Sequence, residues 1–186
     1  REIGSAIAAT IDNPDITIDE LITHVTGPDF PTGGIIYGKA GIADAYKTGR
    51  GKIVVRAKCM LETSNKGRDV IIVTEIPYAV NKSTLIVRIA DLVRDKKIDG
   101  IADLNDESDR NGMRIVIELK KSVSPKVVLN QLYSHSQLQQ NFNVNFLALI
   151  DNRPKLLNLK DAVTCFIAHR QEVVTRRARY DLKKAE

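Results

Sequence analysis

Two neighbouring stretches in the middle of the chain decide the fold: Lys52-Ile-Val-Val-Arg-Ala-Lys-Cys-Met-Leu-Glu62 and Arg68-Asp-Val-Ile-Ile-Val-Thr-Glu-Ile76. β-branched residues are frequent in both, and apolar and charged positions alternate in the first, as expected of a strand with one buried face. The segment between them, Thr63–Gly67, is short and ends in glycine, which suits an antiparallel hairpin. Pro77 predicts the end of the second strand.

Helical patterns surround this hairpin. Ile3, Ile7 and Ile11 are four residues apart and predict one stripe of a helix over residues 2–11. Thr17 with Glu20 forms a capping box, and further N-terminal capping signals stand at Asn81, Ser124-Pro125 and Asn158. The helices predicted after these signals cover residues 18–25, 82–93, 126–133 and 159–186, and a small helix over 42–47 is expected to end at Gly49.

The remaining segments are shorter. Strands are predicted over residues 35–37, 113–119, 142–150 and 155–157, the last two forming a hairpin across residues 151–154, whereas the acidic stretch 99–109 is expected to be a loop. The predicted fold class is α+β: a mostly antiparallel sheet with packed helices and a long C-terminal helix.

Composition excludes several classes of protein. The chain has 186 residues, 43% of them hydrophobic, and its longest apolar runs are four or five residues, whereas a bilayer-spanning helix needs roughly 20. Its two cysteines, Cys59 and Cys165, form no disulfide framework and are expected to be buried small hydrophobes of an intracellular protein. Because the chain starts at Arg1 and stops within a predicted helix, we expect it to be a piece of a longer protein.

The densest positive charge lies between Lys39 and Lys58, a range that contains one acid, Asp44. Arg50 stands between two glycines, where the backbone could approach a phosphate closely. The candidate DNA-binding residues are Lys39, Lys47, Arg50, Lys52, Arg56 and Lys58.

Strand alternation sharpens this interpretation. It places Lys52, Arg56 and Lys58 on one face and Ile53, Val55, Ala57 and Cys59 on the other. The pattern fits a surface that contacts the phosphate backbone of DNA, and equally an ordinary solvated sheet face. Gly49-Arg-Gly-Lys52 lacks the spacing and the Ser/Thr of a nucleotide-binding loop.

Other candidate sites are weaker. Tyr180 lies near Arg176 and Arg177 and could be a phosphoryl-transfer nucleophile, but a half-buried tyrosine on a coiled-coil helix explains it better. The segment Glu107–Glu118 partly fits a calcium loop, but it lacks the initial Asp and the helix that should follow; an acidic turn is favoured. We predict no catalytic residue and no metal site.

Several motifs together point to a family. They are Gly27-Pro-Asp-Phe-Pro-Thr-Gly-Gly-Ile-Ile-Tyr-Gly38, Thr48-Gly-Arg-Gly-Lys52, Glu75-Ile-Pro-Tyr78, Gly112-Met-Arg-Ile-Val-Ile-Glu118 and Val173-Val-Thr-Arg-Arg177. The chain resembles the breakage-reunion (A) subunit of bacterial type IIA topoisomerases from end to end. Phe30, Ala45-Tyr46 and residues 173–177 are more similar to the gyrase branch than to the topoisomerase IV branch, which stays the alternative.

The resemblance implies three parts: connecting helices from a winged-helix domain (residues 1–26), the tower domain (27–158) and the start of a coiled-coil arm (159–186). The tower would support the bent gate DNA segment during ATP-dependent double-strand passage and negative supercoiling. The catalytic tyrosine would lie upstream of Arg1, so the chain alone is expected to be inactive. A structural strut that relays motion between the DNA gate and the C-gate is the alternative function.

The resemblance also implies the partners. They would be double-stranded DNA, the gyrase B subunit, and, within an A2B2 heterotetramer, a second copy of the gyrase A chain, with no membrane. Mg²⁺ and ATP would be used by the whole enzyme through the B subunit, and no cofactor would bind this chain. The expected location is the bacterial cytoplasm, associated with the nucleoid.

Overall fold

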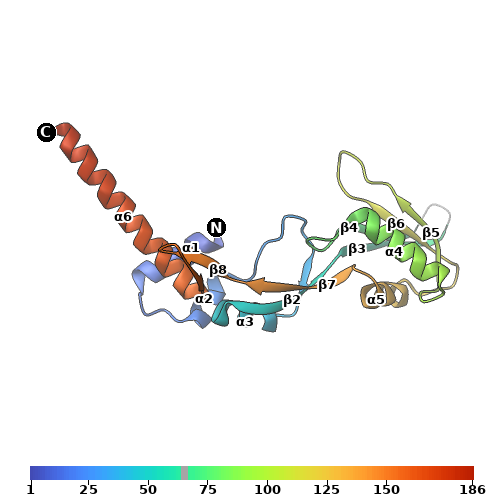
Figure 1. The fold of residues 1–186 in the computed structure, drawn as a ribbon. Helices are drawn as coiled ribbons and strands as arrows, with labels where there is room; N and C mark the ends of the chain where they lie inside the picture. The colour runs from blue at the N-terminus through green and yellow to red at the C-terminus, as the bar shows by residue number, and fades with distance from the viewer. Residues whose placement is uncertain (64–66) are drawn as a thin grey trace. The chain divides into compact units, whose positions relative to one another are not determined.

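The computed structural model describes residues 1–63 and 67–186, and it confirms the α+β class with antiparallel sheets and packed helices (Figure 1). The helices are α1 (Glu2–Asp12), α2 (Ile18–His24), α3 (Ala40–Thr48), α4 (Lys82–Arg94), α5 (Pro125–His135) and α6 (Leu159–Ala185). The strands are β1 (Ile35–Tyr37), β2 (Arg50–Arg56), β3 (Lys58–Thr63), β4 (Asp69–Glu75), β5 (Ile101–Asp106), β6 (Ile115–Leu119), β7 (Gln139–Asn145), β8 (Leu147–Ile150) and β9 (Arg153–Leu156).

The chain divides into two compact units. The first unit comprises residues 1–28, 39–52 and 143–186, and the second comprises 29–38 and 53–142. The chain passes from one unit to the other after residues 28 and 38, within β2 and within β7. A three-stranded sheet has the order β1-β2-β7. A four-stranded sheet, β3-β4-β6-β5, lies wholly in the second unit, and the hairpin β8-β9 lies wholly in the first.

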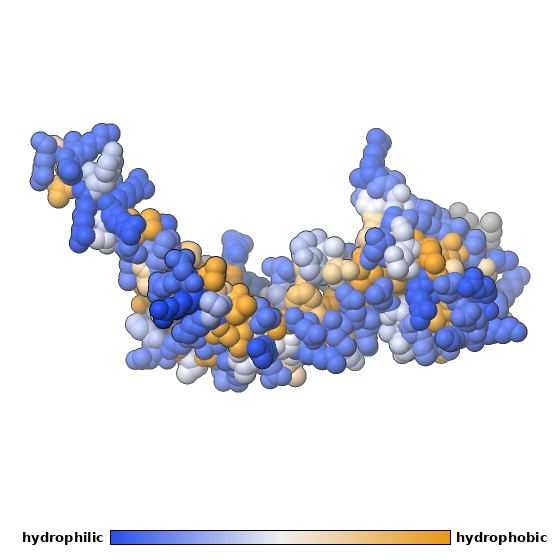
Figure 2. Space-filling model, in the orientation of Figure 1, coloured by the Kyte–Doolittle hydropathy of each residue, from blue (hydrophilic) through white to orange (hydrophobic). Residues whose placement is uncertain are grey.

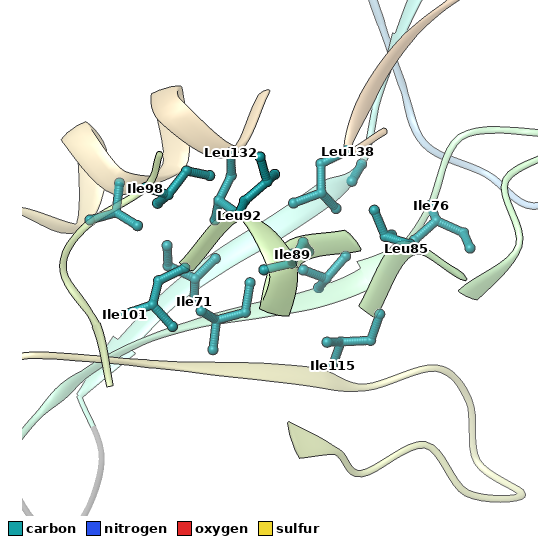
Figure 3. Packing of buried hydrophobic residues seen from close by; sticks show 14 of the residues in the cluster. Ile71, Ile76, Leu85, Ile89, Leu92, Ile98, Ile101, Ile115, Leu132 and Leu138 are labelled. Atoms are coloured by element: carbon teal, nitrogen blue, oxygen red, sulfur yellow. The ribbon is translucent and has the colours of Figure 1, made fainter. Parts of the chain in front are cut away.

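The second unit has the larger core. Alternate residues of the antiparallel strands β4 and β6, among them Ile71 and Ile115, point to one face of the four-stranded sheet. The buried side of α4 and α5 covers this face, with Ile89 and Leu132 fully buried there (Figure 3). The remaining buried members of this cluster are Ala57, Val73, Ile76, Leu85, Leu92, Ile98, Ile101, Ile117, Leu119, Val128 and Leu138.

The first unit is built from α1, α2, α3, α6 and the hairpin β8-β9. Its buried apolar residues include Ala6 of α1, Leu21 of α2, Tyr46 of α3 and Val163 of α6. The C-terminal part of α6 is mostly hydrophilic in the view of Figure 2, and Val163 is the last residue of α6 that is buried. Among the described residues, no helix is both long enough and apolar enough to cross a membrane.

Local capping signals predict the helix starts correctly. The Glu20 backbone N–H donates to Thr17 Oγ1 (3.3 Å) and the Thr17 N–H donates to Glu20 Oε2 (2.7 Å), which completes the capping box. Asn81 Oδ1 accepts from the Thr84 N–H (3.0 Å), and Asn158 Oδ1 accepts from the Asp161 N–H (2.8 Å). α5 begins at Pro125, directly after the predicted cap and one residue before the predicted range, although the Ser124 side chain makes no capping hydrogen bond.

The predicted strand Lys52–Glu62 is wrong in one respect, because it is two strands in two different sheets. The break is at Ala57, whose N–H donates to the Leu138 carbonyl (2.7 Å) and whose carbonyl accepts from the Tyr133 hydroxyl (3.2 Å). Arg56 and Lys58 therefore lie in different sheets, and the register of β3 with β4 shifts between Lys58 and Cys59, so simple alternation does not carry the basic face on to Lys58. β3 and β4 pair antiparallel as predicted; residues 64–66 of the predicted loop lie outside the described residues.

Other strand predictions also change. The acidic stretch predicted as a loop contains β5, an edge strand that pairs with β6. The predicted strand 142–150 is divided into β7 and β8 at Phe146, whose N–H donates to the Gly49 carbonyl (2.9 Å). The hairpin β8-β9 forms as predicted, with both turn residues, Asp151 and Asn152, at positive φ.

The isoleucine stripe of α1 is not a buried face, and the prediction that both cysteines are buried is wrong for one of them. Ile3 and Ile11 are 52% and 59% exposed, and Ala6 and Thr10 are the buried residues of α1 instead. A stripe of isoleucines therefore marks an accessible side of this helix in the described residues. Cys59 is half-buried, but Cys165 is exposed on α6, so only the first thiol packs in the interior.

Candidate nucleic-acid interface

The turn from α3 into β2 presents Arg50 between two glycines that the fold itself requires. Gly49 ends α3 in the left-handed conformation (φ 77°), and a Cβ there would overlap the Leu157 carbonyl oxygen. A Cβ on Gly51 would overlap the Gly41 carbonyl oxygen. The glycines thus allow close packing within the first unit. From the sequence alone, the two glycines are expected to let the backbone approach a phosphate. The packing explains why glycine is required at both positions without invoking a ligand.

The four candidate cations of the first unit differ in their surroundings. Lys39, Arg50 and Lys52 are exposed, and none of them is in an ion pair formed by the described residues. Lys47 is also exposed, but its Nζ lies 2.6 Å from Asp19 Oδ1 of α2. Three cations of this unit are therefore free to meet an external anion without breaking an ion pair within the described chain.

Arg56 is held inside the second unit. Its guanidinium carbon lies 3.8 Å from the centre of the Tyr37 ring and 4.8 Å from that of Tyr133, and its Nε donates to Gln139 Oε1 (2.6 Å). A cation between two aromatic rings gains electrostatic attraction from both ring faces. Burial raises the pKa of Tyr133, with a smaller contribution from Cys59, so its ring stays neutral at physiological pH.

Lys58 is paired within the second unit. Its Nζ lies 3.0 Å from Glu75 Oε1, and the other carboxylate oxygen of Glu75 accepts from the Gly34 N–H (2.6 Å). The Gly34 hydrogen bond, followed by that of Lys58, lowers the pKa of Glu75 below its usual range. This carboxylate therefore ties the glycine-rich loop before β1 to β4 and occupies Lys58 at the same time.

The six candidate residues thus form two groups of different character. Exposed cations without a partner among the described residues (Lys39, Arg50, Lys52) stand in the first unit; the engaged ones are Lys47, Arg56 and Lys58. The sequence interpretation missed the partners Tyr37, Tyr133, Gln139 and Asp19. Glu75 and Tyr37 do stand in the quoted family motifs, which is the one signal that could have marked them.

The weaker candidates find no support as reactive sites. The calcium-like segment uses its own carboxylates: Glu107 Oε2 lies 3.1 Å from Arg114 Nε, and Asp109 Oδ1 accepts from the Asn111 N–H (2.8 Å). Within residues 1–63 and 67–186 no three His, Cys, Asp or Glu side chains gather as a metal site would require. Tyr180 is 67% exposed rather than half-buried.

Comparison with known proteins agrees with the motifs. All of residues 1–186 match the family of the A subunits of DNA gyrase and topoisomerase IV, so the chain belongs to this family, whose members are type IIA topoisomerase subunits. The chain is 57% identical over 187 residues to the DNA gyrase A subunit of Treponema pallidum, a match that covers 100% of the chain and 23% of that protein.

Other gyrase A subunits are almost as similar. The identity is 56% over 184 residues to that of Clostridium acetobutylicum, covering 99% of the chain and 22% of the relative. It is 54% over 186 residues to that of Pseudomonas aeruginosa, covering 99% and 20%. The prediction of the gyrase branch is confirmed, and the chain spans about a fifth of the length of these relatives.

Proposed function

We propose that this chain is the tower region of a gyrase-type A subunit, with residues 1–26 connecting to a winged-helix domain and 159–186 starting a coiled-coil arm. In the whole enzyme it supports the bent gate DNA segment while other domains cut, pass and religate DNA. The enzyme pairs two A subunits with two B subunits, uses Mg²⁺ and ATP through the B subunits, and introduces negative supercoils into the DNA of the bacterial nucleoid.

One observation carries the DNA-contact role. Arg50 and Lys52 are neighbouring cations of β2 that lie exposed, and the turn that presents them is fixed by the packing of Gly49 and Gly51. Cations held without an internal counter-ion can replace the ions condensed on DNA phosphates, and the released ions favour binding. Such contacts position the duplex without reading its sequence.

The strut remains a second candidate because a specific observation favours it. Arg56 is packed between two tyrosines and Lys58 is paired with Glu75, so these cations stabilise the second unit itself. Breaking either arrangement to contact phosphate would cost part of that stabilisation. If the basic residues affect only the stability of the chain and not its affinity for DNA, the chain would transmit movement rather than hold DNA.

The salt dependence of duplex binding separates the two functions. Arg50→Gln combined with Lys52→Gln should flatten the slope of log affinity against log salt by about 0.9 for each lost phosphate contact, about 1.8 in total. All duplex sequences should be weakened alike. Fluorescence anisotropy on the full-length gyrase A chain, and on this chain at low salt, measures the slope.

The matched control is Lys47→Gln, an exposed lysine of the same unit whose partner is Asp19. It should leave the slope nearly unchanged. If the double variant also keeps the parent slope in both proteins, the DNA-contact role is refuted and the strut is favoured. A loss confined to one DNA sequence would instead indicate base recognition, which contradicts the proposal.

A further inference from the structure

A polar pocket of about 360 Å³ in the second unit stands apart from the candidate interface. It is lined by Thr84, Arg88, His135, Ser136 and Gln137. These residues come from α4 and from the end of α5 with the turn that follows it. Every one of them carries a hydrogen-bond donor, and no carboxylate lines the pocket among the described residues.

Core packing holds the two walls in place. Leu85 and Ile89 of α4 are fully buried in the cluster that also contains Leu132 and Leu138 (Figure 3). Thr84 and Arg88 each precede one of these two buried residues of α4 and are one helical turn apart, so they share an edge of the helix. Residues 135–137 are held between Leu132 and Leu138 on the other side.

The turn after α5 is fixed by its own hydrogen bonds. The Ser136 N–H and hydroxyl both donate to the Leu132 carbonyl, at 3.0 and 2.6 Å, and Ser136 Oγ accepts from the Leu138 N–H at 3.2 Å. The end of a helix carries partial negative charge that would repel an anion. Here Ser136 covers the Leu132 carbonyl with two donors and weakens that repulsion.

The charge of Arg88 is uncompensated on this side of α4. Arg88 is exposed and is in no ion pair formed by the described residues, whereas Arg94 of the same helix lies 2.7 Å from Asp91. A planar guanidinium offers two parallel N–H donors, a geometry that matches two oxygens of a phosphate group. Thr84 stands in the first turn of α4, where the helix dipole also favours an anion. Its own N–H and hydroxyl both donate to Asn81 Oδ1, at 3.0 and 3.3 Å, so it lines the pocket without supplying a free donor.

We infer that this pocket binds a phosphate group, with Arg88 as the bidentate donor and His135 and Gln137 as the surrounding donors. A nucleic-acid phosphodiester and a free phosphate ion share this chemistry. The inference does not depend on the tower proposal, because it uses none of the residues on which that proposal rests.

The test is a titration of the ¹⁵N-labelled chain with inorganic phosphate, at constant ionic strength kept with chloride, followed by amide shifts in NMR spectra. Saturable shifts are expected at residues 84–88 and 135–137. Arg88→Gln should weaken phosphate binding at least about tenfold, because it removes charge-assisted hydrogen bonds to the anion. Arg94→Gln, on the same helix, should leave it unchanged.

The outcomes are distinct. Absence of saturable shifts in the pocket, or equal binding by the Arg88→Gln and parent chains, overturns the inference. A short duplex added in place of phosphate identifies the source: shifts in the same residues that vanish in Arg88→Gln indicate a backbone phosphate, whereas shifts with phosphate alone indicate a small anion. Neither result depends on Arg50 or Lys52, so failure here leaves the tower proposal standing.

Discussion

Adding one methyl group at Gly51 should destabilise the first unit strongly. The φ angle of Gly51 is not in the left-handed region, so alanine would be strained there only by its neighbours. Its Cβ would overlap the Gly41 carbonyl oxygen and lie 2.7 Å from both the Cβ and the backbone nitrogen of Ala45. These atoms belong to α3, mostly to its backbone, and cannot move unless the helix shifts.

The size of the effect follows from that geometry. Overpacking a well-packed site costs about 1–3 kcal/mol, and the displaced atoms here are largely backbone, so we expect Gly51→Ala to lower the free energy of unfolding by about 2–3 kcal/mol. Urea unfolding followed by circular dichroism measures this difference. The substitution leaves the charges of Arg50 and Lys52 in place.

Two glycines provide matched controls, because a Cβ on either would meet nothing within 4 Å. Gly4 lies within α1, where alanine should raise the free energy of unfolding by about 0.5–1 kcal/mol. Gly38 has φ 91°, so alanine there should cost about 1–2 kcal/mol for the backbone conformation alone. If Gly51→Ala proves as stable as the parent chain, the packing explanation for this turn is refuted.

Two further predictions concern single side chains. The hydrogen bond from Lys82, followed by those of Ser108, lowers the pKa of Asp106 from 3.8 to about 2, so the stability that this carboxylate contributes is present above about pH 4 and is lost as pH falls towards 2. In Lys82→Gln the pKa should rise towards 3.8 in an NMR titration of the carboxyl carbon; an unchanged value would contradict the assigned cause. Asn158→Ala removes the N-cap of α6 and should cost about 1 kcal/mol in urea unfolding, whereas no change would show that this cap contributes nothing.

Features that depend on neighbouring residues in the sequence could be predicted. The capping box at Thr17, the caps at Asn81 and Asn158 and the helix end at Gly49 all form as the local pattern indicates. Each requires only a side chain and backbone groups within a few residues, so the signal is contained in the sequence.

The strand breaks could not be predicted in this way. After Arg56 the chain leaves the sheet with β1 and β7 and joins the sheet with β4, and the groups that bond Ala57 at this junction, Leu138 and Tyr133, lie far along the chain. β5 was missed because its acids face solvent on a sheet edge, where charged residues are ordinary and the apolar alternation is weak. The isoleucine stripe of α1 shows a related limit, since periodicity indicates an apolar face without saying whether another element covers it.

The same distinction governs the candidate site. The sequence shows which residues are basic but not which are already engaged, and Arg56 depends on Gln139, 83 residues away. A guanidinium held between two rings contributes about 0.5–2 kcal/mol through the ring faces, apart from any DNA it contacts. Substituting Arg56 together with Arg50 and Lys52 would therefore mix a loss of stability with a loss of phosphate contacts.

The informative experiment substitutes them separately. We expect Arg56→Gln to lower the free energy of unfolding without changing the salt slope of DNA binding. We expect the double substitution of Arg50 and Lys52 to change the salt slope without changing stability, so that the two ends of β2 have different roles, one structural and one electrostatic. If Arg56→Gln instead flattens the salt slope in a fully folded chain, Arg56 contacts DNA phosphate despite its position between Tyr37 and Tyr133. The distinction between exposed cations that bind DNA and engaged cations that stabilise the fold is then refuted.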